Sequence, residues 1–143
     1  MLLKQISIFL ENKPGKLAEV TKILQDNKVN IRALSMADTT DFGILRIIVP
    51  EVEKIYKMLK DNHLTVKITE VIGVKVSDRP GGLHEIINFF AHENVNVEYM
   101  YAFVNKTGNN AIIIFKVKNI QQAINILVNN NIELFKYEDI LNI

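Results

Sequence analysis

The chain has 143 residues, 48% of them hydrophobic and 23% charged, with a formal net charge of +1 at pH 7. This composition is typical of a soluble globular protein, and so small a net charge provides no broad basic surface for nucleic acid or anionic membrane. The sequence contains no cysteine, which excludes a disulfide framework, a thiolate metal site and a cysteine nucleophile.

The first half of the chain predicts six elements in the order strand, helix, strand, strand, helix, strand. Alternating apolar residues indicate the strands, and apolar residues three and four positions apart indicate the helices. Leu17 is expected on the apolar face of the first helix, and Pro14 in its first turn, where a missing N–H does no harm. The expected ranges are strand 5–10, helix 14–27, strand 29–36, strand 42–49, helix 50–60 and a strand from 65.

The second half repeats this order. Pro80-Gly81 follows Pro14-Gly15 by 66 positions, and Val95-Asn96-Val97 follows Val29-Asn30-Ile31 by the same offset. A longer hairpin at 105–110 then raises the offset to 68. Two copies that differ by one small insertion indicate an internal duplication, so we expect domains at 1–70 and 71–143. The last strand is expected near 132–137, followed by a tail at 138–143.

Each half therefore has the order βαββαβ. With right-handed crossovers this order gives a ferredoxin-like unit, a four-stranded antiparallel sheet with two helices on one face. The predicted fold class is α+β, with two such units in tandem. The apolar run 65–76 is expected to divide near Gly73 into the last strand of one unit and the first strand of the next. The uncovered sheet faces favour packing between units and a homodimer.

A Pro-Gly loop joins the first strand of each unit to a helix. Main-chain N–H groups at a helix N-terminus lack partners and, with the helix dipole, favour a carboxylate or another small anion. Gly15 and Gly81 allow a ligand to approach the backbone, and the amide of Asn12 can bind both an ammonium and a carboxylate. The alternative is that each Pro-Gly pair only starts a helix. The two loops are Glu11-Asn12-Lys13-Pro14-Gly15-Lys16-Leu17 and Ser77-Asp78-Arg79-Pro80-Gly81-Gly82-Leu83.

The first loop, the spacing to Asn30 and the order of elements resemble an ACT domain, and the whole chain resembles a tandem pair. This family consists of small ligand-binding modules that often regulate amino-acid metabolism, with sites between the loop and a neighbouring unit. The resemblance implies a site in each half of the chain. The implied residues are Asn12, Lys13, Pro14, Gly15, Lys16, Leu17 and Asn30, and then Asp78, Arg79, Pro80, Gly81, Gly82, Leu83 and Asn96.

The two implied sites differ. Asp78 stands in place of Asn12, and its carboxylate would repel a ligand carboxylate but attract an ammonium. Gly82 replaces Lys16, which removes a charge and adds flexibility. Some relatives carry a histidine where Leu10 and Val76 stand in this sequence. We therefore expect the first loop to be the better amino-acid site.

The leading functional hypothesis is a regulatory module, not an enzyme, that binds a small molecule, most simply an amino acid, and acts on a separate protein such as an enzyme. The alternative is an assembly module without a ligand. A small enzyme fits less well, because Arg79 lies in a glycine-rich loop but no catalytic pattern surrounds it. RNA binding also fits poorly, because the strands 44–49 and 112–117 are mostly aliphatic.

We expect no cofactor and no metal site, since His63, His84 and His92 are scattered along the chain without a repeated ligand spacing. No secretory signal is visible, and no apolar run approaches the roughly 20 residues of a membrane helix. The sequence therefore favours a cytoplasmic protein without membrane or nucleic-acid partners.

Overall fold

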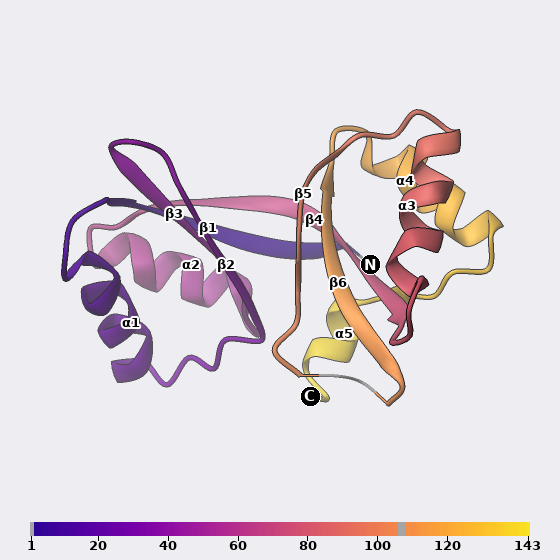
Figure 1. Ribbon diagram of the computed structural model, residues 1–143. Helices are drawn as coiled ribbons and strands as arrows, with labels where there is room; N and C mark the ends of the chain where they lie inside the picture. The colour runs from indigo at the N-terminus through magenta and orange to yellow at the C-terminus, as the bar shows by residue number, and fades with distance from the viewer. Residues whose placement is uncertain (1, 106–107) are drawn as a thin grey trace. The chain divides into compact units, whose positions relative to one another are not determined.

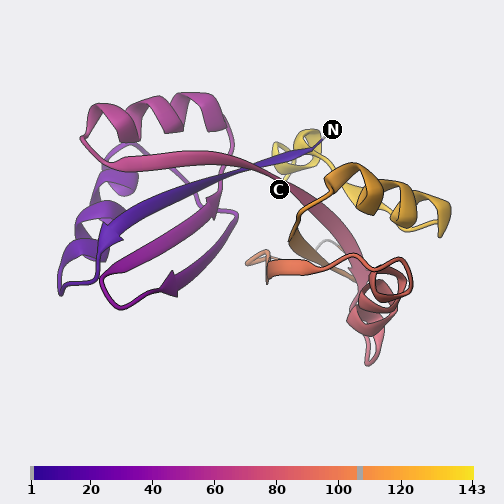
Figure 2. The same ribbon diagram turned by 90° about the horizontal axis from the view of Figure 1, so that it is seen from above.

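The computed structural model describes residues 2–105 and 108–143, which form two compact units (Figures 1 and 2). The N-terminal unit comprises Lys4–Thr69, and the C-terminal unit comprises Leu2, Leu3 and Glu70–Ile143. The division into domains at 1–70 and 71–143 stays a prediction. Two residues of the expected longer hairpin, Lys106 and Thr107, lie outside the described residues.

The N-terminal unit has the predicted βαββαβ order, with its strands in the order β2-β3-β1-β4. β3 pairs antiparallel with both β1 and β2. Ile6 and Ile8 of β1 are fully buried, together with Val20 of the first helix and Leu59 of the second. The elements are β1 Leu3–Glu11, α1 Lys16–Asp26, β2 Ala33–Asp38, β3 Phe42–Ile48, α2 Val52–Asp61 and β4 Thr65–Ser77.

The C-terminal unit repeats this architecture, with strands in the order β5-β6-β4-β7. Figure 1 shows α3 and α4 beside each other in this unit, as α1 and α2 are in the other. Its main core lies between these helices and one sheet face, with the rings of Phe90 and Phe115 edge to face at 5.5 Å. The remaining elements are α3 Gly82–His92, β5 Val97–Ala102, β6 Asn110–Val117, α4 Ile120–Asn129, β7 Leu134–Phe135 and α5 Tyr137–Ile140. The predicted fold class is confirmed.

The expected division of the run 65–76 near Gly73 is wrong, because β4 continues through this glycine. A Cβ atom on Gly73 would lie 2.7 Å from Cδ1 of Leu3 and 3.0 Å from Cβ of Phe135. The glycine therefore provides space for close packing within the strand instead of interrupting it.

The expected C-terminal tail is also wrong, because residues 137–140 form α5. Ile140 is 1% exposed and Phe135 is 2% exposed. The ring of Phe135 lies 4.9 Å from that of Phe103, edge to face. The C-terminal segment therefore contributes to the apolar core of its own unit, and the last strand is β7 at Leu134–Phe135 instead of the expected 132–137.

The four long helices end in the same way. After α1, Lys28 adopts a left-handed conformation with φ 57°, and the N–H of Val29 donates to the carbonyl of Leu24 at 2.9 Å. This arrangement satisfies carbonyls of the last helical turn. Val29 therefore belongs to the helix end, and β2 begins at Ala33 instead of the expected Val29. After the other three helices, the equivalent N–H donates to the equivalent carbonyl: Leu64 to Leu59, Val95 to Phe90, and Ile132 to Leu127.

Candidate functional site

The first Pro-Gly loop turns through a left-handed glycine. Gly15 has φ 88° and ψ −16°, and it precedes α1 as the N-cap residue without a side-chain cap. A non-glycine residue rarely adopts this conformation. Pro14 consequently lies before the helix, so its expected position in the first helical turn is wrong. Asn12 does not cap the helix, and its side chain is exposed.

Main-chain hydrogen bonds fix the shape of this loop. The N–H of Lys13 donates to the carbonyl of Glu11 at 2.9 Å, and the N–H of Lys16 donates to that of Lys13 at 3.3 Å. The N–H of Asn12 donates to the carbonyl of Asp41 at 3.2 Å, so the β2–β3 hairpin also holds the loop. Sequence analysis missed Asp41, although the fold order places this hairpin at the same sheet end as the loop.

The first turn of α1 presents main-chain donors. The helical ladder begins with the bond from the N–H of Glu19 to the carbonyl of Gly15, at 3.0 Å. Leu17 and Ala18 come before Glu19 in the helix, so their N–H groups have no helical carbonyl one turn earlier to accept a hydrogen bond from them. Together with the helix dipole, these groups form a place where a carboxylate is stabilised.

The second loop has the same main-chain bonds. The N–H of Arg79 donates to the carbonyl of Ser77 at 2.9 Å, and the N–H of Gly82 donates to that of Arg79 at 3.0 Å. Gly81 has φ 85° and ψ −9°, almost the values of Gly15. The N–H of Asp78 donates to the carbonyl of Asn109 at 3.1 Å, and the N–H of Glu85 donates to that of Gly81 at 3.1 Å. The duplication therefore preserves the turn although most of its side chains differ.

Charged side chains of the first loop are paired with each other. Lys13 Nζ lies 2.7 Å from Glu11 Oε2, and Lys16 Nζ lies 3.5 Å from Glu19 Oε2. The hydrogen bond and charge of Lys13, with a smaller effect of Lys16, lower the pKa of Glu11. Glu11, through the same hydrogen bond and its charge, raises the pKa of Lys13. A ligand carboxylate would therefore compete with Glu11 for Lys13, whereas the amides of the helix end are open to it.

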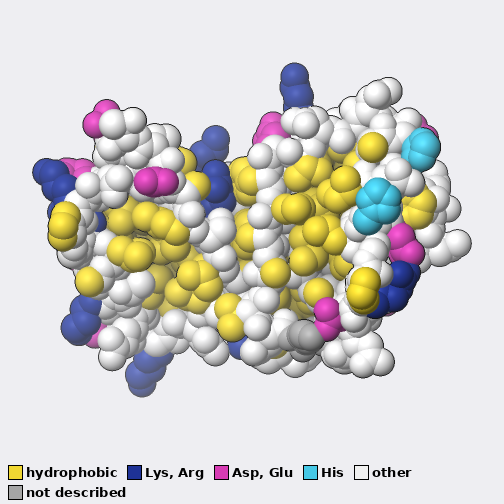
Figure 3. Space-filling view, in the orientation of Figure 1, with side chains coloured by type: hydrophobic (Ala, Val, Ile, Leu, Met, Phe, Trp, Pro, Cys, Tyr) yellow, Lys and Arg dark blue, Asp and Glu magenta, His cyan; other side chains and the backbone are white. Residues whose placement is uncertain are grey.

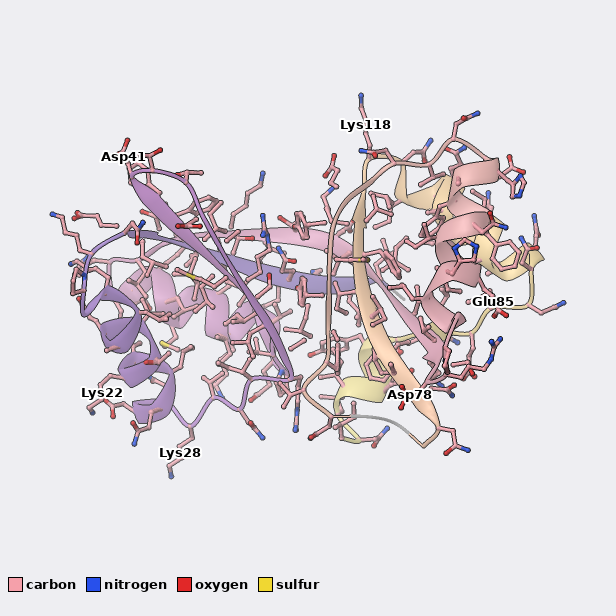
Figure 4. All side chains as sticks on the ribbon, in the orientation of Figure 1. Lys22, Lys28, Asp41, Asp78, Glu85 and Lys118 are labelled. Atoms are coloured by element: carbon pink, nitrogen blue, oxygen red, sulfur yellow. The ribbon has the colours of Figure 1, made fainter. Side chains whose placement is uncertain are left out.

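The second loop is more compact and more acidic. Arg79 forms an ion pair with Glu85, and its Nη1 donates to the carbonyl of Pro80 at 3.3 Å. Figure 4 shows Asp78 before α3 and Glu85 on that helix. Gly82 is buried, and a Cβ atom there would overlap the carbonyl oxygen of Ser77. Close packing, not the expected flexibility, thus explains why glycine replaces Lys16.

A leucine beside each loop is exposed. Leu17 is 42% exposed, so its expected position on the apolar face of the helix is wrong, and Leu83 is 37% exposed. Side chains on a helix point toward its N-terminus, and one in the first turn therefore extends past the helix end. Each helix end thus combines main-chain donors with an apolar side chain.

The two asparagines before the second strands lie away from the loops. β1 and β2 are both antiparallel to β3, so they run in the same direction. The loop follows the end of β1, whereas Asn30 precedes the start of β2, at the opposite sheet end of the same unit. Asn30 borders a depression of about 160 Å³ next to Pro50 and Glu51. Asn96 borders an open depression of about 670 Å³ in the other unit.

The three histidines are exposed. Within residues 2–105 and 108–143, no group of three His, Cys, Asp or Glu side chains is placed to hold a metal ion. In the same part of the chain, no helix has both the length and the apolar character needed to span a membrane.

The sequence matches the ACT domain pair family over residues 1–143. Protein BT0572 from Bacteroides thetaiotaomicron has a similar structure, with a TM-score of 0.91 and 42% identity over 100% of this chain and 98% of that chain. The ligand-free regulatory subunit of aspartate kinase from Thermus thermophilus gives a TM-score of 0.61 and 12% identity, over 89% and 91% of the two chains. The regulatory subunit of aspartate kinase from Thermus flavus gives a TM-score of 0.59 and 13% identity, over 90% of this chain and 93% of that chain. At these identities the two Thermus subunits indicate a common fold only. Among proteins with curated descriptions, none matches this sequence.

Proposed function

Because this chain belongs to the family of ACT domain pairs, we propose that it is a regulatory module without catalytic activity of its own. It binds an amino acid at the loop of residues 12–17 and acts on a separate protein, such as an enzyme of amino-acid metabolism. The regulatory subunits among the structures of similar fold support this proposal by analogy.

The observation that carries the proposal is the nearly identical main-chain geometry of the two Pro-Gly loops. Both loops place a left-handed glycine before a helix and leave the first helical amides directed outward. This geometry suits the carboxylate that all free amino acids share. Asn12 supplies a side-chain oxygen for the ammonium, and the exposed Leu17 supplies an apolar contact for the ligand side chain.

The two loops are proposed to differ in affinity. The first carries the neutral amide of Asn12, whereas the second carries the carboxylate of Asp78. This carboxylate repels a ligand carboxylate, although it attracts the ligand's ammonium. The first loop is therefore the principal amino-acid site of the proposal.

Thermal unfolding of the purified chain with each of the twenty amino acids in turn tests this function. A ligand that binds only the folded state raises stability by about 2.7 kcal/mol at a hundredfold excess over Kd. We expect one chemical group of amino acids to raise the unfolding temperature. If none does so at millimolar concentration, the proposal of an amino-acid sensor is contradicted and the alternative, an assembly module without a ligand, is favoured.

A further inference from the structure

An apolar surface adjoins the first Pro-Gly loop at the end of the sheet. Leu10 is the last apolar residue of β1 before the loop, and it pairs with Gly43 of β3. A Cβ atom on Gly43 would lie 2.5 Å from Cε of Met36 and 3.7 Å from Cγ of Leu10. Glycine at position 43 therefore leaves the space into which the side chain of Met36 extends from β2, toward the loop end of the sheet.

Two side chains beside this loop are accessible to a ligand. Met36 is 46% exposed, and Leu17 in the first turn of α1 is 42% exposed. The side chain of Leu17 extends past the helix start, so it lies next to the main-chain amides of that turn. Figure 3 shows hydrophobic side chains gathered at the surface between the β2–β3 hairpin and α1. Main-chain donors and an apolar surface are thus available together at this end of the unit.

The charged groups of the loop are engaged with each other. Lys13 pairs with Glu11, and Lys16 pairs with Glu19. Figure 4 shows Asp41 at the tip of the β2–β3 hairpin, pointing away from α1. A charged ligand side chain that lies on the apolar surface would lose part of its hydration, whereas an apolar side chain is stabilised there.

The C-terminal unit has smaller side chains at the corresponding positions. Ala102 occupies the position of Met36, and Ala111 occupies that of Gly43. An alanine at position 102 is too short to extend across the neighbouring strand as Met36 does. The methionine and the glycine that makes room for it therefore occur together in the N-terminal unit and are replaced together in the other copy.

We propose that the first loop selects amino acids with apolar side chains, from valine to phenylalanine in size, and that Met36 determines this specificity. The amides of the first helical turn hold the ligand carboxylate, and the ligand side chain lies on Leu17 and Met36. The thioether side chain is flexible and polarisable, so it adapts to branched, unbranched and aromatic ligands. This inference rests on the proposed amino-acid site and names the class of its ligand.

Titration calorimetry of the full chain with leucine, phenylalanine, alanine, glutamate and lysine measures the preference. Burial of one methylene group corresponds to roughly a fourfold change in Kd. Leucine and phenylalanine, which both bury more apolar surface than alanine, are expected to bind about tenfold or more tightly than alanine. Glutamate and lysine are expected to bind no more tightly than alanine.

Variants at position 36 test the role of the methionine. Met36→Ala introduces the residue that stands at position 102, and it is expected to weaken leucine binding about fivefold while leaving alanine binding almost unchanged. Met36→Leu keeps the apolar volume and should retain the preference. Met100→Ala is the matched control, because Met100 on β5 is almost equally exposed, at 45%, and it should leave all affinities unchanged. Thermal unfolding of each variant without ligand shows whether it is folded.

The possible results distinguish this inference from the proposed function. If leucine and alanine bind equally, if a charged amino acid binds most tightly, or if Met36→Ala leaves the ratio of the two Kd values unchanged, the inference is overturned while the amino-acid site stands. If none of the amino acids binds, the proposed function fails and this inference fails with it. A leucine preference that is reduced by Met36→Ala and kept in Met100→Ala supports both.

Discussion

Gly82 packs so closely against Ser77 that a Cβ atom on Gly82 would overlap the carbonyl oxygen of Ser77. The corresponding position in the N-terminal unit is Lys16, whose side chain reaches Glu19 on the surface of α1. The two loops therefore share their main-chain hydrogen bonds but differ in the space beside the helix start. This difference leads to a stability prediction.

Gly82→Ala is expected to lower the free energy of unfolding by about 1–3 kcal/mol, because the new methyl group must displace a main-chain carbonyl. Lys16→Ala at the corresponding position is expected to change it by about 0.5 kcal/mol or less. Urea denaturation of both variants measures the difference. Equal stability of the two variants would contradict the close approach at Gly82.

Asn12→Ala is expected to weaken binding of the amino acid identified by thermal unfolding more than Asp78→Ala does. Loss of a hydrogen bond to a charged group corresponds to about 1.5–3 kcal/mol, or roughly tenfold to a hundredfold in Kd. Titration calorimetry on the two variants provides the comparison. Equal losses, or a larger loss for Asp78→Ala, would exclude the first loop as the principal site.

The carboxyl group of Glu11 is expected to titrate below its usual pKa of 4.5, because it accepts a hydrogen bond from Lys13. A lowered pKa in the folded state stabilises the fold above pH 4.5, and this stabilisation is lost as the pH falls through the lowered value. NMR titration of the side chain measures the pKa. Lys13→Ala should return it toward 4.5, whereas Lys22→Ala, which removes the ion pair with Asp26 on α1, should leave it unchanged.

Ile140→Ala is expected to destabilise the chain by about 2–5 kcal/mol, because its side chain is buried at 1% exposure. Leu141, its neighbour, is 57% exposed, and Leu141→Ala should change stability by about 0.5 kcal/mol or less. Thermal and urea unfolding distinguish the two variants. If the two substitutions had the same small effect, residues 137–140 would be a tail, as the sequence suggested, and not part of the core.

The sequence by itself determined the βαββαβ order of each half, the duplication and the position of both Pro-Gly loops. These features depend on short-range patterns, namely apolar alternation, helical spacing and the backbone preferences of Pro14 and Gly15. Such preferences act within a few residues, and the same pattern occurs twice. The antiparallel fold of each unit followed because short connections and right-handed crossovers leave few alternatives.

Tertiary structure alone decided the continuous course of β4 through Gly73, the burial of Ile140, the exposure of Leu17 and the reason for glycine at position 82. Each of these depends on atoms that are distant in sequence or on the direction of a side chain in three dimensions. Glycine, for example, permits both flexibility and close packing, and only the neighbouring Leu3 and Phe135 show which of them applies at Gly73. Asn30 likewise has a clear place in the sequence motif, but the parallel course of β1 and β2 places it at the end of the sheet opposite the loop.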